Sequence, residues 1–311
     1  MATAKTPTEV AVIRADIARR KKYDMLFAGI GVVCLSIAFL TIAALFVDMV
    51  VTGWSRLSLD FFTNFPSRRS AQAGILSAWV GSVLVMLVTA AVAVPLGVAA
   101  GVWLEEYAPK HWITDVIEIN INNLAGVPSI IYGLLALGLF VYAFGLGQSV
   151  RTAGLTLALL ILPVVIVSTR EAIRSIPQII REGAYALGAT KWQTVKDHIL
   201  PYSMPGILTG IILGMSRAIG ETAPIITIGA LTFIAFLPPA PVTDVAPYLN
   251  FEWLKAPFTV MPIQIFNWTS RPDPAFHQNA AAAGAILVAM TLSMNALAIW
   301  LRYRLRKNLK W

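Results

Sequence analysis

The sequence predicts an all-α, polytopic membrane protein with six transmembrane helices, and three observations lead to this fold class. Hydrophobic residues make up 57% of the 311 residues and charged residues only 13%, whereas a soluble domain carries about 25% charged residues. Long runs without Asp, Glu, Lys or Arg alternate with short charged segments. If the chain crosses the membrane six times, most Lys and Arg residues lie on the same side of the membrane, next to these runs. Together these observations argue against a soluble enzyme.

Each apolar run is near or above the roughly 18–20 residues that a helix needs to cross a bilayer. The first run is longer than the roughly 7–15 apolar residues of a signal peptide, so it is expected to stay as a span. Residues 25–301 therefore form one transmembrane domain, between an N-terminal segment at 1–24 and a basic tail at 302–311. The predicted spans lie at about 25–50, 75–104, 124–146, 153–170, 203–224 and 279–301.

The positions of the basic residues predict the orientation. With six spans, 17 of the 24 Lys and Arg residues fall on one side, which the positive-inside rule makes the cytoplasm. These are six residues before Asp24, Lys110, five from Arg170 to Lys196 and five after Leu301. Both termini are thus expected in the cytoplasm, with the chain in the cell inner membrane. The same rule accounts for Arg170 and for the net charge of +8, so no nucleic-acid partner is expected.

A further apolar run at 222–243 raises the alternative of seven spans. Seven spans would place the two terminal basic clusters on opposite sides, against the positive-inside rule. Residues 222–236 are therefore predicted to continue the fifth span or to form its re-entrant end. The Pro-rich residues 237–278 are predicted to form an outer loop.

Several kinds of site are not expected in this chain. The single cysteine, Cys34, lies in the first span, so a disulfide framework or a cysteine zinc site is not predicted. The three histidines have no nearby ligand set, so no metal is assigned. The sequence contains neither a Gly-x-x-x-x-Gly-Lys-Ser/Thr nor a Gly-x-Gly-x-x-Gly motif. No cofactor, ATP included, is therefore expected to bind to the chain itself.

A cytoplasmic connection of about thirty residues, 171–201, joins the fourth and fifth spans and is long for a helical bundle. Its centre, residues 181–201, reads REGAYALGATKWQTVKDHILP. The residues before Gly188 favour a helix, Gly188 can end it, and an amphipathic stripe follows. Two short helices around a glycine are expected, and such a projecting helix offers a surface to a cytoplasmic partner. The alternative is an ordinary solvated loop.

The same stretch resembles the EAA loop of ABC importer permeases, whose pattern is Glu-Ala-Ala, three residues, Gly, nine residues and Ile-x-Leu-Pro. The matching positions are Glu182, Ala184, Gly188, Leu200 and Pro201. Gly183 and His198 depart from the pattern without changing its spacing. The resemblance implies the type I ABC importer permease (MetI-like) fold. It also implies that ATP and Mg²⁺ are bound by separate ATPase subunits that dock on this loop.

Arg217 and Glu221 are the charged pair of the fifth span. Four residues apart, they stack on one face of a continuous helix, and a charge inside a bilayer needs a partner, so we expect them to pair. One interpretation is an ion pair that staples neighbouring spans. The other is a transient anion site beside a polar path, since a guanidinium fork matches phosphate oxygens.

Other candidates for the substrate path surround this pair in the sequence or begin the third span. Thr222 follows Glu221, between Gly220 and Pro224, which can loosen the helix there. Ser129 and Tyr132 follow Pro128, which can break the third span and present free N–H groups to an anion. A helix-cap role for Ser129 is the alternative.

Two stretches, Ala125–Gly133 (AGVPSIIYG) and Arg217–Pro224 (RAIGETAP), resemble the phosphate-specific members of the permease family. The resemblance implies a non-enzymatic subunit that imports inorganic phosphate by alternating access. The implied partners are a homologous phosphate permease, two copies of a cytoplasmic ATPase, an extracytoplasmic phosphate-binding protein and membrane lipid. The alternatives are the sister phosphate permease, a permease for sulfate or molybdate, and a stand-alone ion-coupled transporter or channel.

Overall fold

The computed structural model describes residues 7–242 and 248–306, and these residues are almost entirely helical. Within them the only extended pairing is one isolated bridge between Val242 and Leu249. The all-α prediction is therefore confirmed. The chain forms two compact units, residues 1–52 and 53–311. The first unit consists of most of α1 (Pro7–Gly53), a 47-residue helix that contains the predicted first span.

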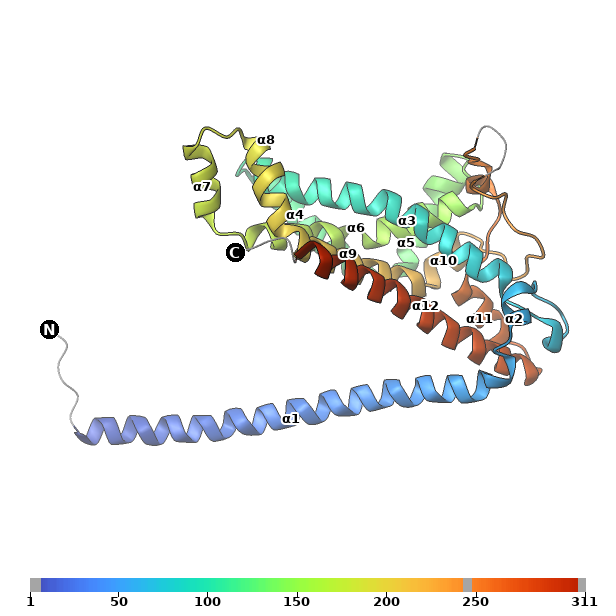
Figure 1. The fold of residues 1–311 in the computed structure, drawn as a ribbon, viewed down its shortest axis with the longest axis horizontal. Helices are drawn as coiled ribbons and strands as arrows, with labels where there is room; N and C mark the ends of the chain where they lie inside the picture. The colour runs from blue at the N-terminus through green and yellow to red at the C-terminus, as the bar shows by residue number, and fades with distance from the viewer. Residues whose placement is uncertain (1–6, 243–247, 307–311) are drawn as a thin grey trace. The chain divides into compact units, whose positions relative to one another are not determined.

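Four long helices form the core of the second unit. They are α3 (Leu76–Val102), α6 (Val150–Arg174), α9 (Leu200–Gly220) and α12 (Ala275–Arg306). Helix α6 packs against both α3 and α9, and α12 packs against α9 and α11 (Met261–Thr269). Figure 1 shows α7 (Gln178–Ala186) and α8 (Lys191–Thr194) at one end of this bundle and α2 (Leu59–Thr63) and α11 at the opposite end. In the described residues, five helices are long and apolar enough to span a membrane, or six if one bent pair counts as a span.

Small residues let α3 and α6 approach each other closely. A Cβ atom added at Gly97 would lie 2.7 Å from Val165 Cγ1, and one at Gly101 would lie 2.7 Å from Thr169 Cβ. Helices in a bilayer associate mainly through such close packing because lipid provides no hydrophobic driving force between them. The α3–α6 contact is therefore the tight centre of the bundle.

The sequence predicted the third span as one helix over 124–146, but in the structure this span is broken near its start. Helix α4 (Trp112–Leu124) ends before a four-residue break, and α5 (Ser129–Ala136) continues as a π-helix to Ala143. The two parts are bent by 106°. Pro128 lacks an N–H group and disfavours helical backbone at the preceding residue, which explains the break.

The fifth span also differs from the predicted 203–224. Its helix is continuous from Lys191 to Gly220, through α8 (Lys191–Thr194), a π-helical turn and α9. The wider turn just precedes Pro201, which cannot donate to the carbonyl four residues earlier. Residues 222–236 do not continue this helix but form the short α10 (Ala223–Thr227), a turn at Gly229 and irregular chain. Gly220 and Pro224 both disfavour an uninterrupted helix here.

Candidate functional site

The ion pair between Arg217 and Glu221 lies at the end of α9. The Nε atom of Arg217 donates to Oε1 of Glu221 at 3.3 Å. Glu221 is the residue after the helix and has extended backbone, with φ −74° and ψ 124°. The sequence predicted that both residues lie within one continuous helix. In the structure the pair instead closes the end of α9. The Arg217 side chain remains 41% exposed, compared with 19% for Glu221.

Helix α10 lies against α5 beyond this pair. A Cβ atom at Gly133 would overlap Thr227 Oγ1 and would lie 2.6 Å from Pro224 Cα, so only glycine permits this approach. Thr222 is the N-cap residue of α10, and its carbonyl accepts the N–H of Ile226 at 3.0 Å. The break after α9 thus brings Thr222 and α10 to the third span.

Tyr132 connects the two halves of that span. Its side chain is buried, and its hydroxyl donates to the carbonyl of Leu124 at 2.7 Å, across the break between α4 and α5. Helix α10, which follows Glu221 and Thr222 directly, packs against α5, the helix that contains Tyr132. The structure therefore places Arg217, Glu221 and Tyr132 in one region. Ser129 is half-buried at the first turn of α5 and, in the described part of the chain, has no hydrogen bond with any of them.

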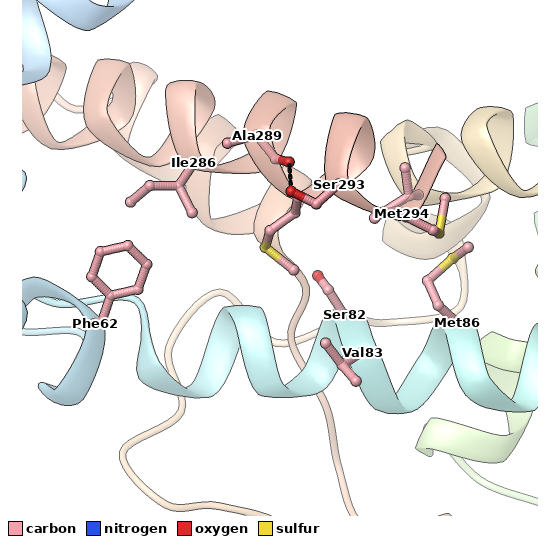
Figure 2. A pocket seen from close by; sticks show the side chains of 10 residues that line it. Phe62, Ser82, Val83, Met86, Ile286, Ala289, Ser293 and Met294 are labelled. Atoms are coloured by element: carbon pink, nitrogen blue, oxygen red, sulfur yellow. Dashed lines mark hydrogen bonds between the residues drawn. The ribbon is translucent and has the colours of Figure 1, made fainter. Parts of the chain in front are cut away.

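A groove of about 510 Å³, here called the α3–α12 groove, adjoins the region of Glu221. Figure 2 shows side chains of α3 and α12 facing each other across it. A small void that Glu221 borders shares Ser82, Met86 and Ile219 with this groove. The residues that line the α3–α12 groove, none of them charged, are Phe62, Ser82, Val83, Met86, Ile219, Ile286, Ala289, Met290, Ser293 and Met294. The groove alone therefore offers no cation to an anionic substrate.

The connection between the fourth and fifth spans is built by local sequence signals. Helix α7 (Gln178–Ala186) is capped by Leu187 and followed by Gly188, whose φ of +84° suits glycine. The N–H of Gly188 donates to Tyr185 O at 2.9 Å and the N–H of Ala189 to Ala184 O at 3.1 Å, which is the Schellman arrangement. The side chains of Thr190 and Gln193 then form a capping box at the start of α8. Two helices meet around the glycine, but the second is not short, because it continues into α9.

The connection of residues 171–201, here called the coupling loop, contains the five residues that match the EAA pattern, and these occupy different environments. Glu182 is exposed on α7, whereas Ala184 is buried. Leu200 and Pro201 are half-buried in the long helix that contains α9. Apolar side chains are also exposed on this loop, with Ile179 73% and Leu187 91% exposed. Exposed apolar side chains of this kind are available to a partner protein.

Arg181 attaches α7 to the end of α3. Its guanidinium donates to Glu106 Oε1 from Nη2 at 2.7 Å and from Nε at 3.0 Å. It also donates to the carbonyls of Ile173 and Ile176. The side chains of Arg181 and Glu106 are only 18% and 6% exposed. All contacts of this guanidinium therefore hold the coupling loop against α3 and the end of α6.

A second group of charges continues this network to α4. Arg170, 6% exposed, lies 2.5 Å from Glu118 of α4 and 3.7 Å from Glu105, although neither contact has hydrogen-bond geometry. Arg174 donates to both carboxylate oxygens of Glu105 at 3.0 and 3.2 Å. We call the six residues of these pairs the charge network: Glu105, Glu106, Glu118, Arg170, Arg174 and Arg181.

The charge network was not predicted from the sequence, in which the positive-inside rule alone accounted for Arg170. The available signal was the pair of adjacent acids, Glu105 and Glu106, directly after an apolar run. Acids at that place need nearby cations when the helix end is packed. Arg170, Arg174 and Arg181 are the partners of these two acids and follow them by 65 to 75 residues in the sequence. The pairing therefore depends on the fold.

Comparison with known proteins identifies the family. The pattern of the family "Binding-protein-dependent transport system inner membrane component" matches residues 93–311. The probable ABC transporter permease protein YqgI of Bacillus subtilis (strain 168) is 33% identical over 295 residues, which cover 93% of this chain and 98% of YqgI. The phosphate transport system permease protein PstA of Yersinia pestis is 33% identical over 255 residues, which cover 80% of this chain and 79% of PstA.

Two solved structures share the fold. A bacterial ABC transporter involved in the import of the polysaccharide alginate has a TM-score of 0.59 at 15% identity, covering 94% of this chain and 98% of that chain. The inward-facing methionine ABC transporter MetNI has a TM-score of 0.56 at 15% identity, covering 72% of this chain and 93% of that chain. This chain therefore belongs to the inner-membrane components of binding-protein-dependent transport systems, and it is an ABC importer permease with the type I, MetI-like fold.

Proposed function

We propose that this permease moves inorganic phosphate into the cell by alternating access. The observation that carries the proposal is the Arg217 guanidinium, which Glu221 holds through a single nitrogen at the end of α9. Its exposed fraction of 41% leaves the other nitrogens accessible to an anion. The similarity to PstA, whose name states phosphate transport, supports this substrate. YqgI, equally similar, carries no substrate in its name.

The arrangement of Arg217 and Glu221 suits transient binding of phosphate. A guanidinium presents parallel N–H donors that match two phosphate oxygens. Glu221 occupies Arg217 when the path is empty and repels a doubly charged anion enough to prevent tight trapping. The hydroxyls of Thr222 and Ser129 are the neutral donors proposed for the same path. Tyr132 contributes to it only in a state in which its hydrogen bond to Leu124 is released.

The coupling loop is proposed to receive the ATPase. The exposed Ile179 and Leu187 and the acidic Glu182 on or beside α7 form a surface that a groove of a cytoplasmic partner can bind. ATP and Mg²⁺ are then bound by two copies of that partner, and this chain itself takes no cofactor. The charge network transmits the movement of α7 to α3, α4 and α6.

The full assembly is proposed to contain one copy of this chain, a homologous phosphate permease and two ATPases, served by an extracytoplasmic phosphate-binding protein. Both chain termini lie in the cytoplasm in this proposal. A permease for sulfate or molybdate and the sister phosphate permease are the alternative roles. A stand-alone transporter or channel would have no use for the apolar surface of α7.

Uptake by the reconstituted complex tests the proposal. The expected result is ATP-dependent accumulation of radiolabelled phosphate in proteoliposomes, competed by unlabelled phosphate but not by sulfate or molybdate. The Arg217→Gln variant is expected to assemble with its partners and to lose uptake. Preferential uptake of sulfate or molybdate would overturn the assignment of phosphate. Uptake by the chain alone, without ATPase, would overturn the assignment of an ATP-driven complex.

A further inference from the structure

A second groove, of about 720 Å³, opens between α3 and the long helix that contains α8 and α9. We call it the α3–α9 groove; residues of 94–107 line one side and residues of 192–211 line the other. Its deep part is purely apolar, with Val94, Val98, Leu208 and Ile211 on its walls. It lies in the half of the bundle that adjoins the coupling loop.

Aromatic residues surround the end of the groove nearest the coupling loop. Trp103, Tyr107 and Trp192 line it and are 48%, 37% and 61% exposed. Trp and Tyr gather at the boundary between hydrocarbon and headgroups because their rings have an apolar body and a polar edge. This end of the groove therefore marks the level of the lipid headgroups.

Two lysines stand at the same end. Lys196 lines the groove, and the Nζ atom of Lys191 lies 4.9 Å from the ring centroid of Tyr107. Within residues 7–242 and 248–306, neither lysine has a carboxylate at ion-pair distance, although Asp197 adjoins Lys196 in the sequence. Two cations without acidic partners at the mouth of an apolar groove are complementary to an amphiphile with an anionic head.

The length of the groove distinguishes a lipid from a protein helix. The ten residues from Val94 to Trp103 span about 14 Å along a helix axis, close to one leaflet of a hydrocarbon core of about 30 Å. A spanning helix of another subunit would require a groove across both leaflets. The α3–α12 groove differs from the α3–α9 groove in two ways: α12 forms its second wall, and none of its lining residues is charged (Figure 2).

We propose that the α3–α9 groove binds one anionic phospholipid of the leaflet beside the coupling loop. An acyl chain lies along the apolar walls, and the phosphate of the headgroup contacts Lys191 and Lys196. Basic pockets between transmembrane helices on the cytoplasmic side bind anionic headgroups in this way. The lipid would then separate α3 from the helix that leads out of the coupling loop. This site is independent of the anion that the permease transports.

Lipid titration of the purified, delipidated complex tests the proposal, with native mass spectrometry as the readout. The probes are phosphatidylglycerol and phosphatidylcholine with the same acyl chains. Lys196→Gln is expected to weaken the highest-affinity binding of phosphatidylglycerol roughly fivefold, and the double change with Lys191→Gln roughly twenty-five-fold. Lys110→Gln is the matched control, because Lys110 is a lysine of the same predicted side that does not line the groove. Binding of phosphatidylcholine is expected to be weaker and unchanged in all three.

A fourth variant tests the groove itself. Ala99 lines the groove and is exposed, so Ala99→Phe fills the space of the acyl chain while leaving both lysines in place. This variant is expected to lose the same lipid that the lysine variants lose. Unchanged phosphatidylglycerol binding in the double lysine variant would overturn the site. Unchanged binding in Ala99→Phe would show that the lysines attract lipid only from the surface, or that protein covers the groove, and would equally overturn it.

Discussion

The Nη2 atom of Arg181 lies 2.7 Å from Oε1 of Glu106, in a contact that solvent hardly reaches. Arg181 belongs to α7, and Glu106 belongs to the π-helical end of the α3 span. The pair therefore joins the coupling loop directly to a membrane span. A force on α7 acts on α3 through this contact without first moving the long α8–α9 helix.

The first prediction concerns this ion pair. Removing one partner of a buried pair leaves an uncompensated charge and costs about 3–5 kcal/mol. Glu106→Gln and Arg181→Gln are each expected to detach α7 from α3, and substrate-stimulated ATP hydrolysis of the complex is expected to fall at least tenfold. Basal hydrolysis, measured in the same preparation, is expected to change much less, because it does not require the permease to respond.

Glu171→Gln is the matched control for these variants. Glu171 is 64% exposed and lies 3.7 Å from Arg174, so its loss should change the free energy of folding by less than about 1 kcal/mol. The exchange Glu106→Arg with Arg181→Glu tests whether the contact itself matters. Partial recovery in the exchanged protein supports a direct linkage, whereas full stimulation in both single variants would contradict it.

The second prediction concerns Gly188. Its positive φ costs an ordinary residue about 1–2 kcal/mol, and a Cβ atom there would meet nothing within 4 Å. Backbone strain rather than crowding therefore limits substitution. Gly188→Val is expected to unravel the Schellman turn and to reduce co-purification of the ATPase, while Gly188→Asn, which tolerates this conformation, retains most of it. Equal retention by both variants would show that the turn is dispensable for docking.

The structure also explains which features the sequence could predict. The apolar runs predicted the spans, and the residues around Gly188 predicted the turn, because helix and turn signals act over a few neighbouring residues. The exact end of α9 was harder: Glu221 was placed within a helix because its spacing from Arg217 fits one. Gly220 and Pro224 weaken the helix locally, and the packing of α10 against Gly133, which the sequence does not reveal, accompanies the break at that point.

The charge network depends on longer distances still. Glu105 and Arg174 meet because α3 and α6 pack closely up to the approach of Gly101 to Thr169, and a single sequence does not contain that register. Likewise, Tyr132 was predicted to lie in the substrate path from its position after Pro128. Its bond to Leu124 could be seen only when the angle between α4 and α5 was known.

The third prediction separates the two roles of Tyr132. Tyr132→Phe removes a hydrogen bond of about 0.5–1.5 kcal/mol and leaves the carbonyl of Leu124 without this donor. We expect a lower midpoint of thermal unfolding, by a few degrees, with phosphate uptake at least half of normal. Tyr142→Phe is the control, since Tyr142 is 73% exposed on the same segment. Loss of uptake with an unchanged midpoint would instead place the hydroxyl in the path.

The fourth prediction concerns topology. In a Cys34→Ala background, a membrane-impermeant thiol reagent added from outside is expected to label Arg68→Cys and not Gln178→Cys. Both side chains are exposed, and α2, which precedes Arg68, and α7, which begins at Gln178, lie at opposite ends of the bundle (Figure 1). Cysteines placed in 1–24 or 302–311 should be protected, and one at Asp244, which lies outside the described residues, should be labelled. Labelling of either terminus from outside would overturn the six-span orientation.

The last prediction concerns Arg217 as the fixed cation of the path. Arg217→Gln is expected to abolish phosphate uptake in a complex that still assembles, because no neutral side chain replaces the charge. Arg217→Lys should recover only part of the activity, since an ammonium lacks the planar fork that matches two phosphate oxygens. Initial uptake rates at several phosphate concentrations, with the amount of assembled complex measured in parallel, provide the comparison.

Exchange of the two charges distinguishes a substrate site from a staple. In the structure the positions are unequal, because residue 217 lies in the last turn of α9 and is 41% exposed, whereas residue 221 has extended backbone and is 19% exposed. If the pair only closes the end of α9, Arg217→Glu with Glu221→Arg keeps an ion pair and should transport better than either single variant. If Arg217 binds phosphate, the exchange removes the exposed guanidinium and places a carboxylate where the anion binds. Transport should then fail as completely as in Arg217→Gln, and near-normal uptake by the exchanged protein would leave the pair a purely structural staple.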